Sequence, residues 1–377
     1  MKPLDGILVL EFSQFMAGPS AGLRLADLGA RVIKIERPET GEAGRNIATK
    51  NMYLDGSSLV FHTANRNKES FTANLKDKED LKKVNSLIAK ADVLTHNFRP
   101  GVMEKIGLDY DSVVQINPKL VYATVTGYGR KGEWIAKPGQ DLLIQAISGL
   151  THLSGNQNDL PTPFGAAAVD MLCGTHLVQG ILAALIKRTK TYKGAWVEVS
   201  LLESAIDFQL EIFTTFLNNG KKPPLRSKTN NAHALLEAPY GIYGTSDGHI
   251  AISMGPFGIL LNILGLSEEL HDLDTFINRD ELKEEISNAL QKKSTKEWLV
   301  ELQAKGLWCS EVNNYHQILG SEEFKELAMK QEVKLLDGSL FYTTRCPIRI
   351  NDETLLSSKP APRVGEHTER ITQEFNI

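Results

Sequence analysis

Residues 7–36 have the sequence ILVLEFSQFMAGPSAGLRLADLGARVIKIE, and this stretch decides the fold class. The apolar run Ile7–Phe12 has the length of a buried strand, Ala17–Ser20 is a small-residue turn, and a helix is expected to end at Gly29. A second strand follows at Val32–Glu36. Strand, helix and strand within about thirty residues form a βαβ unit and predict a parallel sheet of Rossmann-like topology. The turn lacks the GxGxxG pattern, which disfavours a nicotinamide-dependent dehydrogenase.

The rest of the chain repeats this alternation and then changes character. A helix is expected over about Glu79–Lys90 and a long amphipathic one over 201–217. The polar linker 218–231 predicts a domain boundary, and the segment 240–252 predicts a β-hairpin. Further strands are expected at Ser70–Ala73, Asp92–His96, Leu120–Thr126 and Trp196–Ser200. We therefore expect an α/β protein with a second, smaller domain.

The overall composition is that of an ordinary globular protein. The chain has 377 residues, of which 42% are hydrophobic and 23% charged, and its net charge of −4 does not favour a nucleic-acid partner. The three cysteines are widely spaced, which predicts reduced core residues and neither disulfides nor a metal site. No signal peptide is expected, and no apolar run is expected to approach the length of a membrane span. These features predict a soluble, cytoplasmic protein without a membrane partner.

Basic residues follow three successive predicted strands. Arg37 comes directly after the second strand, Lys76 ends Asn74-Leu75-Lys76, and Asn97-Phe98-Arg99 follows the strand at 92–96. Ligands of open α/β sheets bind at the carboxyl ends of the strands, so these clusters predict an anionic ligand with several phosphates. Any one of them could equally be solvated surface charge.

The segment Pro161–Lys187, PTPFGAAAVDMLCGTHLVQGILAALIK, places one acid at the start of a strongly apolar helix. A helix cap is the ordinary role for Asp170, and covalent catalysis is the alternative. Asp141 has the same ordinary role at the start of another helix. The chain has no HExxH or HxxxH spacing, no GxSxG and no P-loop, so a metal enzyme is unsupported and covalent chemistry would fall to a carboxylate. The small residues around Asp170, including Gly174, would let another backbone come close.

As an ordered set, segments across most of the chain resemble the class III CoA-transferases (CaiB/BaiF type). This family includes formyl-CoA transferase, carnitine CoA-transferase and alpha-methylacyl-CoA racemase. The segments that carry the resemblance are AGPSAGLRLADLGARVIKIERP, NRNKESFTANLK, ADVLTHNFRPGVMEKIGL, KPGQDLLIQAISGL, the Asp170 stretch with GILAAL, YKGAWVEVSLLESA, DGHIAIS and APRVGEHT.

The resemblance implies a Rossmann-like large domain built from both chain ends, with a small α+β domain inserted. The ranges expected are 1–205 for the large CoA-binding domain, 206–231 for a linker helix and linker, 232–328 for the small domain and 329–377 for the C-terminal return. A homodimer of two interlocked ring-shaped subunits is also implied.

The resemblance further implies that Asp170 is the nucleophile and that coenzyme A is bound as substrate, without a metal. Acyl-CoA and a carboxylic acid would be the partners. The residues implied to contact CoA are Met16, Ala17, Arg37, Ala73, Asn74, Leu75, Lys76, Asn97, Phe98, Arg99, Lys105, Lys137, Pro138, Gly139 and Gln140.

The chemistry implied is CoA transfer between acids through an aspartyl anhydride and an aspartyl-CoA thioester on Asp170. Formyl-CoA transferases have glutamine at the position of Met16, a Tyr-Glu pair at Gln140-Asp141 and a glycine-rich loop that is missing here between Lys228 and Pro239, which disfavours formate and oxalate. A racemase would need a histidine at position 140, where Gln140 cannot act as a base, although His152 or His233 could replace it. Racemisation and CoA binding without turnover remain the alternatives.

Overall fold

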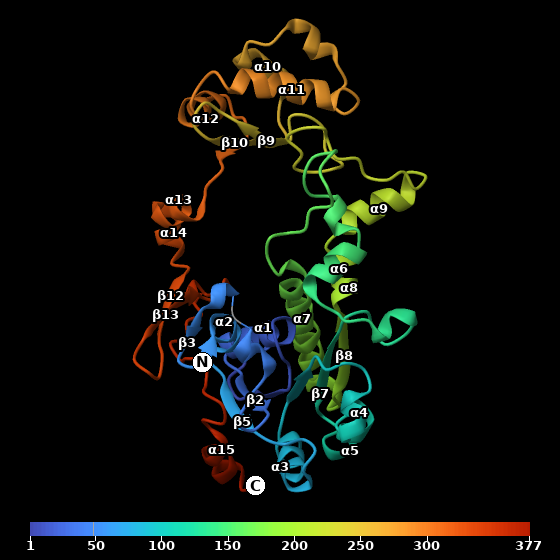
Figure 1. Ribbon diagram of the computed structural model, residues 1–377, viewed down its shortest axis with the longest axis vertical. Helices are drawn as coiled ribbons and strands as arrows, with labels where there is room; N and C mark the ends of the chain where they lie inside the picture. The colour runs from blue at the N-terminus through green and yellow to red at the C-terminus, as the bar shows by residue number, and fades with distance from the viewer. Residues whose placement is uncertain (48) are drawn as a thin grey trace. The chain divides into compact units, whose positions relative to one another are not determined.

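The computed structural model describes residues 1–47 and 49–377, which form two compact units (Figure 1). The first contains Met1–Ile144, Ala166–Phe208 and Leu327–Ile377, and the second contains Gln145–Gly165 and Gln209–Glu326. These units differ from the expected ranges, because 145–165 and 209–231 both join the second unit. Side chains of the expected linker hold this segment: Arg226 donates to the carbonyls of Ser154 and Asp159, and Asn231 donates to that of Gly155.

A six-stranded sheet forms the centre of the first unit. The strands are β1 (Leu8–Glu11), β2 (Arg31–Glu36), β5 (Glu69–Thr72), β6 (Val93–His96), β7 (Val121–Thr126) and β8 (Ala195–Ser200), in the spatial order β5-β2-β1-β6-β7-β8. Every neighbouring pair is parallel, which confirms the predicted parallel sheet. The strand order reverses direction between β1 and β6, and this place is a topological switch point.

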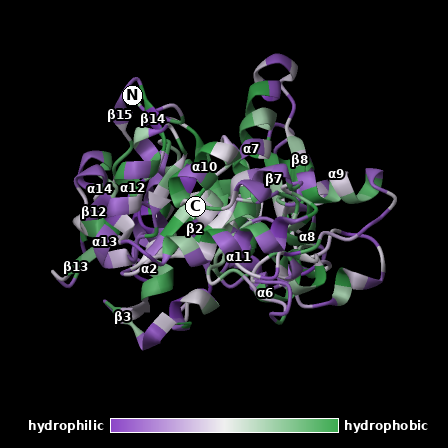
Figure 2. Ribbon diagram, turned by 90° about the horizontal axis from the view of Figure 1, so that it is seen from above, coloured by the Kyte–Doolittle hydropathy of each residue, from purple (hydrophilic) through white to green (hydrophobic). Residues whose placement is uncertain are grey.

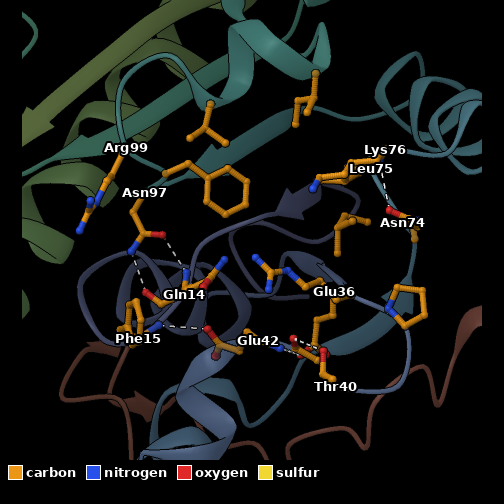
Figure 3. A pocket seen from close by; sticks show the side chains of 18 residues that line it. Gln14, Phe15, Glu36, Thr40, Glu42, Asn74, Leu75, Lys76, Asn97 and Arg99 are labelled. Atoms are coloured by element: carbon orange, nitrogen blue, oxygen red, sulfur yellow. Dashed lines mark hydrogen bonds between the residues drawn. The ribbon is translucent and has the colours of Figure 1, made fainter. Parts of the chain in front are cut away.

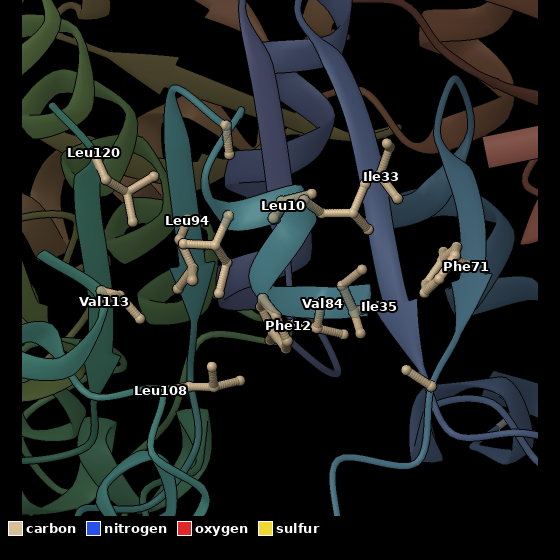
Figure 4. Close-up of a cluster of buried hydrophobic side chains, with 14 of the residues drawn as sticks. Leu10, Phe12, Ile33, Ile35, Phe71, Val84, Leu94, Leu108, Val113 and Leu120 are labelled. Carbon is tan, nitrogen blue, oxygen red and sulfur yellow. The ribbon is translucent and has the colours of Figure 1, made fainter. Parts of the chain in front are cut away.

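Helices cover both faces of the sheet (Figure 1). On one face α1 (Ala17–Asp27) packs against α7 (Ala168–Thr191) and the strands, and on the other lie α3 (Lys78–Ile88), α4 (Val102–Ile106), α5 (Tyr110–Ile116) and α15 (Thr368–Phe375). Figure 4 shows the apolar core of this second face, in which Leu10, Ile33 and Leu94 meet Val84 and Val113. Nearly every residue of β1, β2 and β6 is buried, as expected for parallel strands that are covered by helices on both faces of the sheet.

The structure corrects two predicted helix boundaries, at the start of α1 and within residues 201–217. Ala17–Ser20 is the first turn of α1, not a separate turn, because the first four amides of a helix need no intrahelical acceptor and Pro19 is tolerated there. Helix 201–217 is two helices, α8 (Leu201–Asp207) and α9 (Leu210–Asn218), and the chain passes between the two units at this break.

The expectation that no apolar run reaches membrane length was also wrong. By length and composition α7 could cross a membrane, and it is the one such helix within residues 1–47 and 49–377. Eight of its residues, among them Leu177 and Ile181, are instead buried in the same unit, where α7 packs against α1, β7, β8 and α8. The wide apolar face predicted from the sequence is therefore the mark of a core helix.

The second unit contains a small antiparallel sheet of order β11-β10-β9, in which β9 (Gly241–Gly244) and β10 (His249–Ile252) form the predicted hairpin. The third strand is β11 (Cys309–Glu311). Around it pack α10 (Phe257–Leu264), α11 (Arg279–Leu290) and α12 (Thr295–Ala304). Figure 2 shows that α11 combines polar and apolar residues, and its Leu282 and Ile286 are buried.

The remaining elements are short. They are β3 (Tyr53–Leu54), β4 (Ser57–Ser58), α2 (Leu59–Asn65), α6 (Asp141–Ile147), α13 (Tyr315–Gly320), α14 (Glu322–Leu327), β12 (Lys330–Lys334), β13 (Leu340–Thr344), β14 (Arg349–Ile350) and β15 (Glu353–Thr354).

The close approach expected at Gly174 gives a testable prediction. A Cβ atom there would lie 2.7 Å from the backbone oxygen of Ala17 and 2.2 Å from Oγ of Ser20 on α1. We expect Gly174→Ala to destabilise the protein by about 1–3 kcal/mol in thermal unfolding, because the helix pair is overpacked. Thr175→Ala, at an exposed position on the same helix, is the control and should stay within about 0.5 kcal/mol of wild type. An equal effect of both substitutions would contradict the role of the helix contact.

Candidate active site

A cavity of about 730 Å³ opens at the carboxyl ends of four neighbouring strands of the first unit (Figure 3). Gln14 and Phe15 follow β1, Arg37 follows β2, Ala73–Lys76 follow β5, and Asn97–Arg99 follow β6. The cavity therefore spans the switch point between β1 and β6, where open α/β sheets bind ligands. We refer to it as the strand-end pocket.

Eight of the residues expected to contact CoA line this pocket. They are Arg37, Ala73, Asn74, Leu75, Lys76, Asn97, Phe98 and Arg99. They meet because consecutive parallel strands end at the same edge of the sheet.

The other expected contacts lie outside the lining. Met16 is the N-cap residue of α1 and Ala17 is the buried first residue of that helix. Lys105 is exposed on α4, although Val102 and Ile106 of the same helix line the pocket. Lys137–Gln140 is an exposed segment before α6, held at the end of β7 because Gly139 packs directly on Gly127.

Several residues of the pocket lining were not among the expected contacts. Gln14 and Phe15 follow the first strand directly, so the strand-end rule alone could have indicated them. Thr40, Gly41 and Glu42 belong to the loop after β2, and no local pattern marks them. The lining also includes Ile35, Glu36, Pro38, Val102 and Ile106.

The acids of the pocket are neutralised from within the protein. Glu36 receives two hydrogen bonds from the Arg45 guanidinium, at 2.8 and 2.7 Å, which lower the pKa of Glu36 although its burial acts to raise it. Glu42 lies 3.4 Å from Lys34 Nζ, but burial dominates and raises the pKa of Glu42. Arg37, Lys76 and Arg99 form no ion pair with any acid of the described chain. The pocket therefore presents an excess of positive charge to a ligand.

Asp170 is the third residue of α7 and is not its N-cap, because Ala167 holds that position and the side chain that bonds the first turn is that of Asp141. The ordinary role considered for this acid is therefore wrong. Burial, followed by the charge of Asp141, raises the pKa of Asp170 to about 7. Oδ2 of Asp141 accepts the backbone N–H of Asp170 at 2.9 Å, so two carboxyl groups share this site. A carboxyl group with a pKa near neutrality can act in catalysis.

The contact between α1 and α7 places Asp170 about one turn from the start of α1. Gly174 lies one turn after Asp170 on the same face of α7 and touches Ala17, the first residue of α1. Four residues of helix rise about 6 Å, so Asp170 lies about that far along α7 from this contact. Gln14 and Phe15 of the pocket lining lead along the chain into the same start of α1.

Other reactive groups are already engaged or buried. His176, two turns after Asp170, contacts Ser204 at 3.0 Å and Asp207 at 3.3 Å. The cysteines are free, and Cys173 and Cys346 are buried. No group of three or more His, Cys, Asp or Glu side chains able to hold a metal occurs in the described part of the chain.

Comparison with known proteins defines the class. The model of CoA-transferase family III matches residues 4–368 of this chain. The match covers nearly the whole sequence, and the chain belongs to this family.

The relatives include several named CoA-transferases. The chain is 35% identical to an acetyl-CoA:oxalate CoA-transferase of Acetobacter aceti over 99% of this chain and 96% of the relative. It is 31% identical to a succinate–glutarate CoA-transferase of Agrobacterium fabrum, with the same coverage of both chains. A crystal structure of a CAIB/BAIF family protein from Brucella suis superposes with a TM-score of 0.85 at 33% identity, covering 99% of each chain. The predicted family is therefore confirmed.

The raised pKa of Asp170 predicts how stability depends on pH. The folded protein holds this proton up to about pH 7, whereas an ordinary aspartic acid loses it near 3.8. The folded state binds more protons between these values, so the stability contributed by Asp170 falls as pH rises from about 4 to about 7. We expect the melting temperature of Asp170→Asn to increase relative to wild type across this window, as measured by thermal unfolding at several pH values.

Asp109→Asn is the control for this pH dependence. The pKa of Asp109 lies below its ordinary value, through hydrogen bonds from Ser112 that outweigh burial. It is ionised in both states above about pH 5, so its substitution should give a constant difference there. A constant difference for Asp170→Asn as well would contradict the raised pKa.

Proposed function

We propose that this protein is a CoA-transferase that moves CoA from an acyl-CoA thioester to a carboxylic acid through covalent intermediates on Asp170. The observation that carries the proposal is the half-buried Asp170 carboxyl group with its raised pKa, in the same unit as the basic pocket at the strand ends and in a chain of CoA-transferase family III. The relatives support transfer between acids, and their names cover several different acids.

The strand-end pocket suits the nucleotide part of CoA. Arg37 and Lys76 on one side and Arg99 on the other supply cations for phosphate groups. The guanidinium of Arg37 and the ring of Phe98 can also stack on an adenine. We propose that this Rossmann-like sheet binds the nucleotide part of CoA. We also propose that CoA is contacted at the same edge by Met16, Ala17, Lys105 and Lys137–Gln140.

The chemistry follows from the Asp170 carboxylate. It attacks the carbonyl carbon of the donor thioester, the C–S bond breaks, and CoA leaves as thiolate from a mixed anhydride. The thiolate then attacks the aspartyl carbonyl, which gives an aspartyl-CoA thioester and releases the donor acid. The acceptor carboxylate attacks this thioester, and the thiolate finally attacks the acceptor carbonyl and regenerates Asp170. Asp170 must be ionised to start, so turnover should rise with pH through about 7.

The alternatives receive no support from a specific feature of the structure. Gln140, at the position of the racemase base, is exposed and cannot transfer protons near neutral pH. His233, considered as a replacement, already contacts Glu211 through its imidazole. We further propose that the enzyme is a cytoplasmic homodimer, as its family resemblance implies.

Covalent trapping tests the nucleophile. With a panel of acyl-CoA donors and hydroxylamine, we expect intact-protein mass spectrometry to show a hydroxamate at Asp170, since both proposed intermediates are acyl derivatives of this side chain. Asp170→Ala should lose the adduct and the exchange activity but still bind CoA. Exchange at the wild-type rate by Asp170→Ala would exclude this mechanism, and deuterium uptake at the α-carbon without any adduct would favour racemisation.

Neutralising a pocket cation tests the CoA site. We expect Arg37→Ala to weaken CoA binding about tenfold in isothermal titration calorimetry, equivalent to about 1.4 kcal/mol, because a phosphate or adenine contact is lost. Higher ionic strength should weaken binding by wild type more than by the variant. Lys82→Ala, on the exposed side of α3 and paired with Glu79, is the matched control and should bind CoA as wild type does. Unchanged affinity in Arg37→Ala would place the nucleotide elsewhere.

A further inference from the structure

The loop between β1 and α1 holds an unusual backbone conformation. Phe15 has a φ of 66°, in the left-handed region that bulky side chains rarely adopt. Its side chain is 47% exposed, so no burial of the ring explains the conformation. Phe15 lines the strand-end pocket, and Met16 after it begins the turn into α1. Strained residues persist only where their surroundings hold them.

Two side chains hold this loop from opposite sides (Figure 3). The Asn97 amide makes a reciprocal pair with Gln14: its Oδ1 accepts the Gln14 N–H at 2.8 Å, and its Nδ2 donates to the Gln14 carbonyl at 2.7 Å. Oε2 of Glu42 accepts the Phe15 N–H at 3.0 Å. Three consecutive polar groups of the loop backbone are thereby bonded to side chains from the segments that follow β6 and β2.

Glu42 is itself held by Asn65 and Lys34 through its other carboxylate oxygen. Its Oε1 accepts a hydrogen bond from Asn65 at 3.3 Å and lies 3.4 Å from Lys34 Nζ. Lys34 in turn donates to the carbonyl of Ser13 at 2.7 Å, directly before the loop. Glu42 and Lys34 are buried, so these bonds form away from water and restrict the loop to one arrangement.

We propose that Asn97 and Glu42 are positioning residues, which hold the Gln14–Phe15 turn so that the pocket and Asp170 lie in register for transfer. Asn97 was expected to contact CoA, but its carbonyl and amino groups are already bonded to Gln14. Glu42 has no role in the expected site. The inference rests on the proposed function, because it assigns to the loop the alignment of a bound thioester with the nucleophile.

Alignment of reacting groups appears in turnover more than in affinity, and a misplacement of about 1 Å can cost about a hundredfold in rate. We therefore expect Asn97→Ala to lower kcat by about ten- to a hundredfold while the Kd for CoA changes less than about threefold. Glu42→Gln can keep an acceptor for the Phe15 N–H, but its amino group then faces Asn65 Nδ2 and Lys34 Nζ, so kcat should fall less than in Glu42→Leu, which removes every acceptor and should resemble Asn97→Ala.

Asn117→Ala is the matched structural control. The side-chain amide of Asn117 also bonds the backbone, because it donates to the carbonyls of Ile88 and Ala91 at 2.9 and 2.8 Å. Asn117 follows α5 and lies outside the lining of the strand-end pocket. Its loss should lower the melting temperature and leave kcat unchanged. If Asn97→Ala lowers the melting temperature to the same extent and also keeps wild-type kcat, the positioning role is overturned.

A third variant keeps the test independent of folding. Phe15→Gly relieves the left-handed strain, because glycine adopts positive φ readily, and it leaves both clamping side chains in place. Because Asn97 and Glu42 still hold the turn, we expect its melting temperature to equal or exceed that of wild type, and Asn97→Ala added to this variant should still lower kcat by about ten- to a hundredfold. Equal kcat of Phe15→Gly with and without Asn97→Ala overturns the proposal.

The wild-type measurements separate the two levels of inference. CoA binding and acyl exchange by wild type support the proposed function, and the variants then decide the positioning role alone. Absence of both from wild type would overturn the proposed function, and the role of the loop in transfer would fall with it.

Discussion

The rest of the first unit depends on the ion pairs that the buried carboxylate of Glu11 forms with two lysines. Lys34 donates to it at 3.0 Å and Lys68 at 2.9 Å, and all three side chains are fully buried. Burial lowers the pKa of Lys68 to about 8, although the charge of Glu11 acts to raise it. Loss of one partner would leave an uncompensated buried charge, which is strongly destabilising. The cluster joins β1, β2 and the entry to β5, and it requires glycine at position 22, where a Cβ would lie 1.7 Å from Glu11.

The same cluster reaches the pocket through Lys34, which contacts both Ser13 and Glu42. The pocket loop is therefore supported by charges buried inside the sheet. The cations Arg37, Lys76 and Arg99 of the lining form no such internal ion pairs in the described chain. On the other side the tight contact at Gly174 joins α7, the helix that carries Asp170, to the start of α1, which directly follows this loop. Burial that makes α7 a core helix also raises the pKa of Asp170, so one packing arrangement places the acid and sets its protonation. The structural core and the chemistry of the site are parts of one arrangement.

Much of this could be predicted from local patterns. The strands of the parallel sheet are short apolar runs, and the residues after them share one edge, which is why Arg37, Lys76 and Arg99 were found together. Prediction failed where distant segments decide the outcome. The helix expected over 201–217 breaks where the chain changes units, and residues 145–165 join the second unit through bonds from Arg226 and Asn231. Lys105 and Gln140 lie outside the pocket lining although they stand at the same edge.

The sequence by itself determined the fold class and the family and predicted which strand ends line the pocket, because hydrophobic periodicity and strand-end position are local properties of the chain. Only the tertiary structure decided the role of each polar side chain. Glu42 and Asn97 cannot be told from solvated surface residues until the loop that they hold is seen, and Asp170 is distinguished from a helix cap only by its surroundings. Hydrogen bonds and burial between residues far apart in sequence set these roles, and no local pattern encodes them.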